Sequence, residues 1–215
     1  MLLEASLWSL SRFLPGEPIL RIPSELRARG RLLAEFHTEA ATIEGLEQRP
    51  GWRRAEATLA DPGIDEILSA HESARPEEIR TLRWHLDRAR QRAESLDLAK
   101  RSSIPVHGDF ATWNLLFTGS RLTGLIDFEL AHQDHRMADF CLAWRGKYDE
   151  VIEGYEEVSP LAPEERAALV PIWWASLIET ACQNLSRGFD DQGWTMSKIL
   201  TRSPLMGPDA DPFSA

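Results

Sequence analysis

Three polar side chains in one stretch of the sequence have the types and the spacing that phosphoryl transfer requires. Asp109 and Asn114 are five positions apart, and Asp127 follows Asn114 by thirteen. An amide oxygen beside a carboxylate suits Mg²⁺, which takes one or two carboxylates together with waters and substrate phosphates. A further carboxylate that does not bind the metal can accept a proton from an attacking hydroxyl group.

A predicted β-hairpin brings two of these side chains together. Residues 115–117 and 122–128 are rich in strand-forming residues, and turn-forming residues separate them at 119–121. Asn114 stands at the start of the first strand and Asp127 near the end of the second. Because these ends are neighbours in an antiparallel pair, both oxygen ligands can converge on one point.

The loop before the hairpin is predicted to carry Asp109 to the same place. The apolar run 104–106 ends at His107-Gly108, where glycine permits a sharp turn. Each residue alone has an ordinary structural interpretation, since Asp after Gly is common in turns and Asn at a strand start bonds locally. The three together, with a hairpin between them, favour a phosphotransferase site.

The same residues carry a resemblance to a known family. His107-Gly108-Asp109, then Asn114, then Ile-Asp-Phe-Glu at 126–129 resembles the aminoglycoside phosphotransferase family, which includes choline-kinase-like and homoserine-kinase-like enzymes. That family is similar to protein kinases in fold. The match covers residues 104–143, and the spacing of Asp109 and Asn114 is also that of the kinase catalytic loop.

The resemblance implies a role for each matched residue. Asp109 would be the catalytic base, and Asn114 and Asp127 would hold Mg²⁺. His107 and Asp139 would support the site structurally, because Asp139 falls where the family has an aspartate that braces the catalytic loop. We also expect Glu129, two residues after Asp127, to be able to contact an acceptor amine.

The resemblance also implies an α+β fold, namely a protein-kinase-like large lobe that is mainly helical, with a small hairpin at the catalytic site. We expect residues 1–16 to be a remnant strand of the small lobe and the hinge, residues 17–201 the large lobe, and residues 202–215 a flexible tail. The backbone of Arg12, Phe13 and Leu14 would then face the base of ATP or GTP.

Two usual kinase parts are not recognisable in the sequence. No Gly-x-Gly-x-x-Gly precedes Asp109, and Lys100, Lys147 and Lys198 are the only lysines, none of them on a strand upstream of the catalytic loop. We therefore expect most of the small lobe to be missing from this chain. Because charge-assisted phosphate contacts contribute roughly 1.5–3 kcal/mol each, we expect impaired nucleotide binding by the chain alone.

Helices are predicted around this segment. Apolar periodicity favours helices at 24–40, with Ser24 as the N-cap, at 76–98 and at 147–158. A further helix should begin at Pro163, break or kink near Pro171, and end at Arg187-Gly188. Residues 41–75 read as rich in loops, with a short helical pattern at 64–70, and 129–136 as a polar loop.

The composition of the chain limits which kinds of binding partner and cellular location we expect. The chain has 215 residues and a formal net charge of −10, with no basic patch, so we predict no nucleic-acid partner. The acidic balance suits a cationic acceptor or simply solubility. Cys141 and Cys182 fit no redox or zinc pattern. No apolar run is long enough to span a bilayer, so we expect no membrane association and a soluble, cytoplasmic protein.

Two functions from different classes remain open at this stage. One is a small-molecule kinase acting on a hydroxyl group of an amino sugar, an antibiotic or an amino alcohol. The other is a non-catalytic kinase-like ligand-binding module or truncated family member, favoured by the missing phosphate-binding parts. A metallophosphoesterase built on His107 and Asp109 lacks further His and Asp ligands at metal-site spacing.

Overall fold

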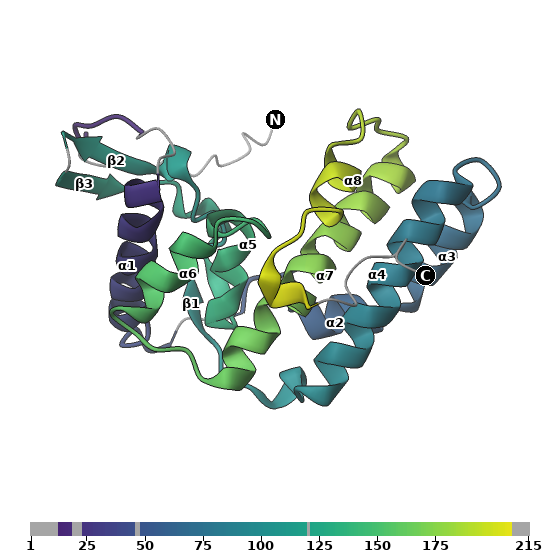
Figure 1. Ribbon diagram of the computed structural model, residues 1–215, viewed down its shortest axis with the longest axis horizontal. Helices are drawn as coiled ribbons and strands as arrows, with labels where there is room; N and C mark the ends of the chain where they lie inside the picture. Colours follow the sequence, from purple (N-terminus) through teal and green to yellow (C-terminus); the bar gives the residue numbers. More distant parts are fainter. Residues whose placement is uncertain (1–12, 19–22, 46–47, 120, 208–215) are drawn as a thin grey trace, which may run out of the picture.

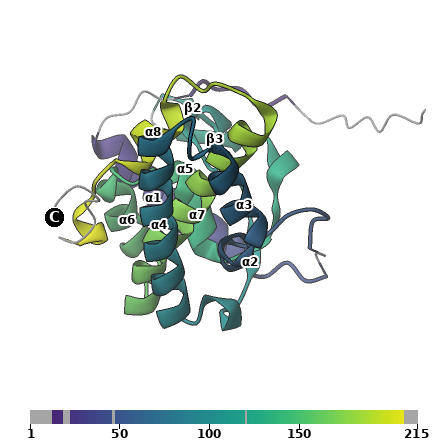
Figure 2. The same cartoon turned by 90° about the vertical axis from the view of Figure 1, so that its right-hand side faces the viewer.

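The computed structural model describes residues 13–18, 23–45, 48–119 and 121–207 as two groups of elements joined by one long helix (Figure 1). The first group holds α1 (Pro23–Ala40), α5 (Phe140–Ala143), α6 (Asp149–Glu156) and the strands, and the second holds α2 (Ala55–Ala60), α3 (Pro62–His71), α4 (Pro76–Ser95) and α8 (Trp194–Ile199). The joining helix is α7 (Pro163–Arg187), which contacts α2, α3, α4, α5 and α8. Seen from their own side, α3 and α4 lie in front of α7 (Figure 2).

Two short antiparallel sheets carry the catalytic segment. The predicted hairpin is confirmed as β2 (Leu115–Thr118) and β3 (Arg121–Leu125). The other sheet pairs β1 (Ile104–Val106) with β4 (His132–Asp134), so the prediction of a polar loop over 129–136 was wrong. β4 shows no apolar alternation because its buried side chains, His132 and Asp134, are polar and contact each other at 3.3 Å.

Two glycines allow α1 and α6 to cross at backbone contact. A Cβ atom at Gly30 would overlap the carbonyl oxygen of Val151, and one at Gly154 would overlap that of Arg27. Only glycine therefore fits at either position. The first group of elements depends on this crossing, because α1 also packs against β1, the strand that leads into the catalytic loop.

The helix α7 runs through Pro171 as one element, so the predicted break near this residue was wrong. A proline inside a helix removes one hydrogen bond and costs about 3 kcal/mol. Nearly every residue around it is buried, among them Val170, Ile172, Trp173 and Trp174. Tertiary packing therefore outweighs the local cost of the proline. The predicted end is confirmed, since Gly188 closes the helix with φ +62°.

The other helices follow the predicted pattern with local differences. The helix α1 begins at Pro23, one residue before the expected cap at Ser24, and α4 and α6 lie within their predicted ranges. Residues 41–75 are more regular than expected, since α2 and α3 occupy most of 55–71. The segment just before α2 contacts the catalytic segment, because Trp52 stacks on His132 with ring centroids 4.0 Å apart.

Both ends of the described chain pack on the rest. Residue 17 pairs with the hairpin through two backbone hydrogen bonds between Glu17 and Phe117, of 2.9 and 3.0 Å. The expectation of a flexible tail was wrong for 202–207, where Ser203 and Met206 are buried in a 3₁₀ turn. Residues 208–215, and most of the predicted N-terminal strand, lie outside the described residues. Among the helices that are described, none has the length and apolar character of a membrane span.

Candidate active site

The predicted catalytic loop, residues 107–114, directly follows β1 and turns sharply at a glycine. Gly108 has φ +80°, and a Cβ atom there would overlap the carbonyl oxygen of Leu130. No other residue type satisfies both conditions without strain. The turn is what directs Asp109 away from the sheet and toward the hairpin.

Asp139 holds this loop from the start of α5. Its carboxylate is buried and accepts hydrogen bonds from the backbone N–H of His107 at 2.9 Å and of Gly108 at 2.7 Å. It also accepts from Nε2 of His37 at 3.0 Å. Two of these three donors are loop amides, so the carboxylate ties the loop to α1 and α5.

His107 connects the loop to the far end of the hairpin. The ring is fully buried, and its Nε2 donates to the carbonyl oxygen of Ile126 at 3.0 Å. Nδ1 of the neutral ring then accepts from the backbone N–H of Asp109 at 3.2 Å. One side chain thus ties the residue before Asp127 to Asp109.

Asp109 and Asn114 are in direct contact. The side-chain amide of Asn114 donates to Oδ2 of Asp109 at 2.8 Å and to its backbone oxygen at 2.9 Å. Trp113 also donates to Oδ2, through Nε1 at 3.2 Å. Because Nδ2 of Asn114 is engaged, its Oδ1 is the side-chain atom left to bind a metal. Sequence reasoning missed Trp113, although it lies four residues after Asp109.

Asp127 lies beside Asn114 in an unusual backbone conformation. Ile126 donates its N–H to the carbonyl oxygen of Asn114 at 3.0 Å, just beyond the last pair of the hairpin, Leu115 with Leu125. Asp127 itself has φ +67°, which is uncommon for a residue other than glycine and marks functional positions. Its side chain is exposed.

The remaining predicted site residues lie around this centre. Glu129 is exposed two residues beyond Asp127, and its backbone oxygen accepts a hydrogen bond from Arg49. Leu14 packs against Gly124 of the hairpin, whereas Phe13 is 85% exposed. Arg12 lies outside the described residues.

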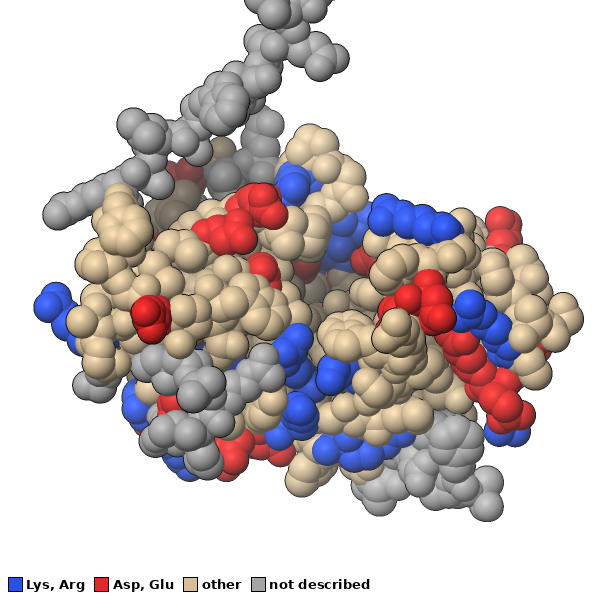
Figure 3. Space-filling model, turned by 90° about the horizontal axis from the view of Figure 1, so that it is seen from above, with Lys and Arg blue, Asp and Glu red and all other residues tan. Residues whose placement is uncertain are grey.

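A cavity of about 260 Å³ opens beside Gly108, between β4 and α5 on one side and α2, α7 and α8 on the other. Three tryptophans and two carboxylates are among its walls: Trp52, Trp173, Trp194, Asp134 and Glu179. The face that carries the hairpin is hollowed between the two groups of elements, with acidic and basic side chains around the hollow (Figure 3).

Comparison with known sequences places the chain in a family. The model of the "Phosphotransferase enzyme family" matches residues 2–169. A homoserine kinase from Rhizobium etli is 33% identical over 180 residues, which cover 70% of this chain and 49% of that protein. A second, from Methylobacterium nodulans, is 28% identical over 189 residues and is covered to 59%. The chain spans about half the length of the curated relatives it matches.

Solved structures agree on the fold. An aminoglycoside phosphotransferase from Alicyclobacillus acidocaldarius superposes with a TM-score of 0.62 at 15% identity, covering 86% of this chain and 63% of that one. Another, a thermostable mutant in ternary complex with AMP-PNP and hygromycin B, gives 0.59 at 20% identity, with 87% and 68% covered. These confirm the predicted α+β, kinase-like large lobe. The catalytic segment, the fold and the family match agree, and the chain belongs to the phosphotransferase enzyme family.

Proposed function

We propose that the protein transfers the γ-phosphate of a nucleoside triphosphate to a hydroxyl group of a small molecule. The observation that carries this proposal is the state of the Asp109 carboxylate. Oδ2 is held by Asn114, whereas Oδ1 is buried and has no hydrogen-bond partner among the described residues. A buried carboxylate oxygen without a donor costs free energy, and the hydroxyl of a bound acceptor would supply that donor.

In the proposed reaction, Asp109 is the general base. An acceptor hydroxyl within hydrogen-bond reach of Oδ1 passes its proton to the carboxylate as its oxygen attacks phosphorus. Asn114 and Trp113 hold the carboxylate in place, so that little orientational freedom is lost in the transition state.

The residues present suit a magnesium ion. Oδ1 of Asn114 and the exposed carboxylate of Asp127 are hard oxygen donors, and two protein ligands are the usual number when phosphates and waters complete the shell. In the described part of the chain, no cluster of three or more His, Cys, Asp or Glu side chains exists. When bound, Mg²⁺ would neutralise charge developing on the phosphates.

For the donor we propose ATP or GTP, since solved structures of similar fold contain AMP-PNP or ADP. The base would lie against the backbone of residues 12–14 (Arg12, Phe13 and Leu14), where Leu14 meets the hairpin. This proposal keeps the division into a hinge before residue 17 and a large lobe after it. A nucleotide donor and two free cysteines, Cys141 and Cys182, fit a cytoplasmic location.

For the acceptor we propose a small amino alcohol or amino sugar that occupies the cavity beside Gly108. Aromatic rings and a carboxylate attract an ammonium group. Trp52 supplies a ring there, and Glu179, which also pairs with Arg53 at 3.1 Å, supplies a carboxylate. Glu129, next to Asp127, is a second candidate contact for the amine. Curated relatives named homoserine kinase support an acceptor of this class.

A specific observation favours the second candidate, a kinase-like binding module. No lysine bonds to Asp109, Asn114 or Asp127 among the described residues: Lys100 pairs with Asp97 at 2.6 Å, and Lys147 and Lys198 lie over the rings of Tyr148 and Trp194. Losing two phosphate contacts of roughly 1.5–3 kcal/mol each weakens nucleotide binding a hundredfold or more. Calorimetry with Mg-ADP on the 215-residue chain separates the two candidates. The kinase must bind the nucleotide, whereas a module without catalysis needs to bind only the acceptor.

Replacing the base tests the leading proposal. Asp109→Asn should lower kcat for phosphorylation of homoserine or another amino alcohol by about 10²–10⁴-fold, whereas the affinity for Mg-ADP should change little. Asp97→Asn, a matched change at an exposed aspartate, should leave both quantities unaltered. The measurement is a coupled ADP-release assay across a panel of acceptors, and undiminished turnover by Asp109→Asn would refute the role of Asp109.

A further inference from the structure

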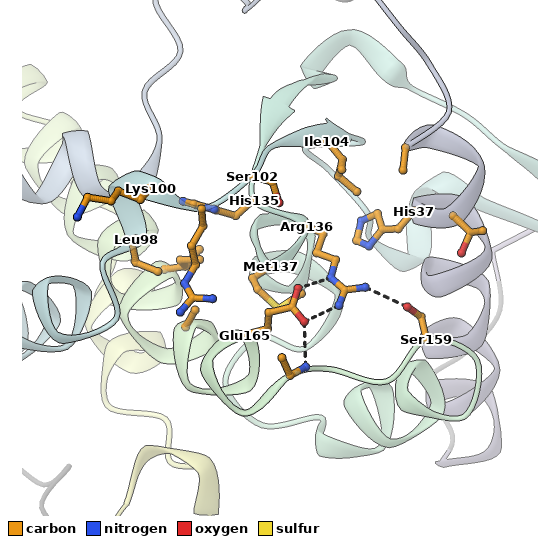
Figure 4. Close-up of a pocket in the computed structure, with 16 residues that line it drawn as sticks. His37, Leu98, Lys100, Ser102, Ile104, His135, Arg136, Met137, Ser159 and Glu165 are labelled. Atoms are coloured by element: carbon orange, nitrogen blue, oxygen red, sulfur yellow. Dashed lines mark hydrogen bonds and ion pairs between the residues drawn. The ribbon is translucent and has the colours of Figure 1, made fainter.

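A second cavity in the described part of the chain is larger than the one beside Gly108. It has a volume of about 590 Å³ and lies between the end of α1, residues 98–104, residues 135–137 and the first turns of α7 (Figure 4). That volume is in the range of small-molecule binding sites. None of the residues assigned to phosphoryl transfer lines it.

The cavity has an excess of positive charge in a protein whose net charge is −10. Its walls include Lys100, Arg101 and Arg136 but a single carboxylate, Glu165. In Figure 4 the Lys100 ammonium group points away from Arg136, which faces Glu165. The walls therefore hold two guanidinium groups, those of Arg101 and Arg136, and one carboxylate, which pairs with Arg136.

These two arginines are engaged to different degrees. Arg136 donates two hydrogen bonds to the Glu165 carboxylate, from Nε at 2.7 Å and from Nη2. Its Nη1 donates to Ser159 at 2.9 Å. Arg101 donates only through Nε, to the backbone oxygen of Leu96 at 3.1 Å. Within the described residues its two terminal nitrogens have no bond, so the fork that best recognises carboxylates and phosphates is open.

The rest of the lining is mostly apolar. Leu98, Ile104, Met137, Ala168 and Ile172 contribute side chains to it. An apolar wall beside an open guanidinium suits a ligand with an apolar body and one anionic head group, because each part then finds a matching surface.

A chain of buried hydrogen bonds connects this cavity to the catalytic loop. Nη1 of Arg136 donates to the hydroxyl of Tyr155 at 3.2 Å, and that hydroxyl contacts Nδ1 of His37 at 3.0 Å. His37, itself part of the cavity wall, bonds through Nε2 to Asp139. Asp139 holds the backbone N–H groups before Asp109.

We propose that this cavity binds a small amphipathic anion, a carboxylate or phosphate monoester on a short apolar chain, at Arg101, and that its binding changes the rigidity of the catalytic loop. A second anion balances the two guanidinium groups and competes with Glu165 for Arg136. The hydrogen bond from Arg136 to the Tyr155 hydroxyl then weakens or strengthens, and this changes the hydrogen bond between His37 and Asp139. A resulting effect on phosphoryl transfer rests on the proposed function, whereas ligand binding and loop rigidity do not.

Binding is tested by calorimetry with octanoate, octyl phosphate and uncharged octanol on the full chain. We expect saturable binding of at least one anion, no saturation with octanol, and an affinity about tenfold or more weaker in Arg101→Gln. Arg75→Gln, at an exposed arginine that precedes α4 and does not line the cavity, should bind as the unaltered protein does. Equal affinity for octanol, or for Arg101→Gln, would overturn the proposal, and the comparison of the two anions identifies the head group.

Transmission is tested by hydrogen exchange at the amides of His107 and Gly108. Saturating anion should change their exchange rates by about fivefold or more, and Tyr155→Phe should retain anion binding but lose this change. If the exchange rates do not change at saturating anion, the proposed effect of binding on the catalytic loop is refuted. Since neither readout involves turnover, an inactive enzyme does not affect the outcome.

Discussion

At the scale of single residues, the site depends most on side chains that never meet a substrate. Asp139 sets the catalytic loop, and His107 ties the loop to the residue before Asp127. The sequence placed both through the family resemblance. It could not place His37, because a partner 102 positions away in the chain leaves no trace in local spacing.

A buried histidine away from the site makes stability depend on pH. His85 on α4 is fully buried against Trp84 and Trp174, with Nδ1 on the carbonyl of Thr81 at 2.8 Å and Nε2 without a partner among the described residues. Burial lowers the pKa of His85 from 6.5 to about 4. Between these values the unfolded chain binds a proton that the folded protein does not, so stability falls as the pH falls.

The expected loss is about 3 kcal/mol between pH 6.5 and about pH 4. His85→Leu should remove this part of the pH dependence, and urea denaturation at several pH values measures it. Leu86→Ala, at a buried position without a titratable group, should lower stability to a similar degree at every pH. An unchanged slope in His85→Leu would contradict this origin of the pH dependence.

At the scale of elements, strong apolar periodicity predicted helices correctly, whereas segments without it were wrongly predicted to be loops. The helices α1 and α4 repeat apolar residues every three or four positions, so both were predicted close to their bounds. β4 and α2 escaped prediction because their burial comes from contacts with distant segments, as when Trp52 covers His132. The predicted break at Pro171 was wrong for the same reason. Burial of the surrounding residues outweighs the tendency of proline to end a helix.

The crossing of α1 and α6 should tolerate no side chain at Gly30. Gly30→Ala forces the two backbones apart and should cost about 1–3 kcal/mol or more of unfolding free energy, although alanine favours helices. At Gly63→Ala, a helical glycine whose added Cβ would meet only the Asp61 side chain at 3.1 Å, stability should change by less than about 1 kcal/mol. Thermal denaturation compares them, and equal effects would refute the packing argument.

At the scale of the whole molecule, residues 202–207 close the structure over α4 and α6. Met206 is fully buried, Ser203 donates to Asp149 at 2.9 Å, and Arg92 donates to the backbone oxygen of Met206. The sequence gives little sign of this, because three prolines and few apolar residues are typical of a loose terminus. One buried methionine is enough to anchor it.

Two deletions measure what residues 202–207 contribute to stability. Removing residues 202–215 should lower unfolding free energy by about 2–5 kcal/mol, as expected for loss of a buried methionine and its contacts. The chain without residues 208–215 keeps every described contact and is the reference for this comparison. Urea midpoints of the two shortened chains give the comparison, and a stable 201-residue chain would show that Met206 contributes nothing.

The hairpin is attached on two sides, and this has a mechanical consequence. Its base carries Asn114 and leads into Asp127, while along β2 it pairs with Glu17 through Phe117. A movement of Glu17 therefore acts directly on the hairpin, whose strands set the distance between the two proposed metal ligands. A displacement of Glu17 would be passed through β2 to the distance between Asn114 and Asp127.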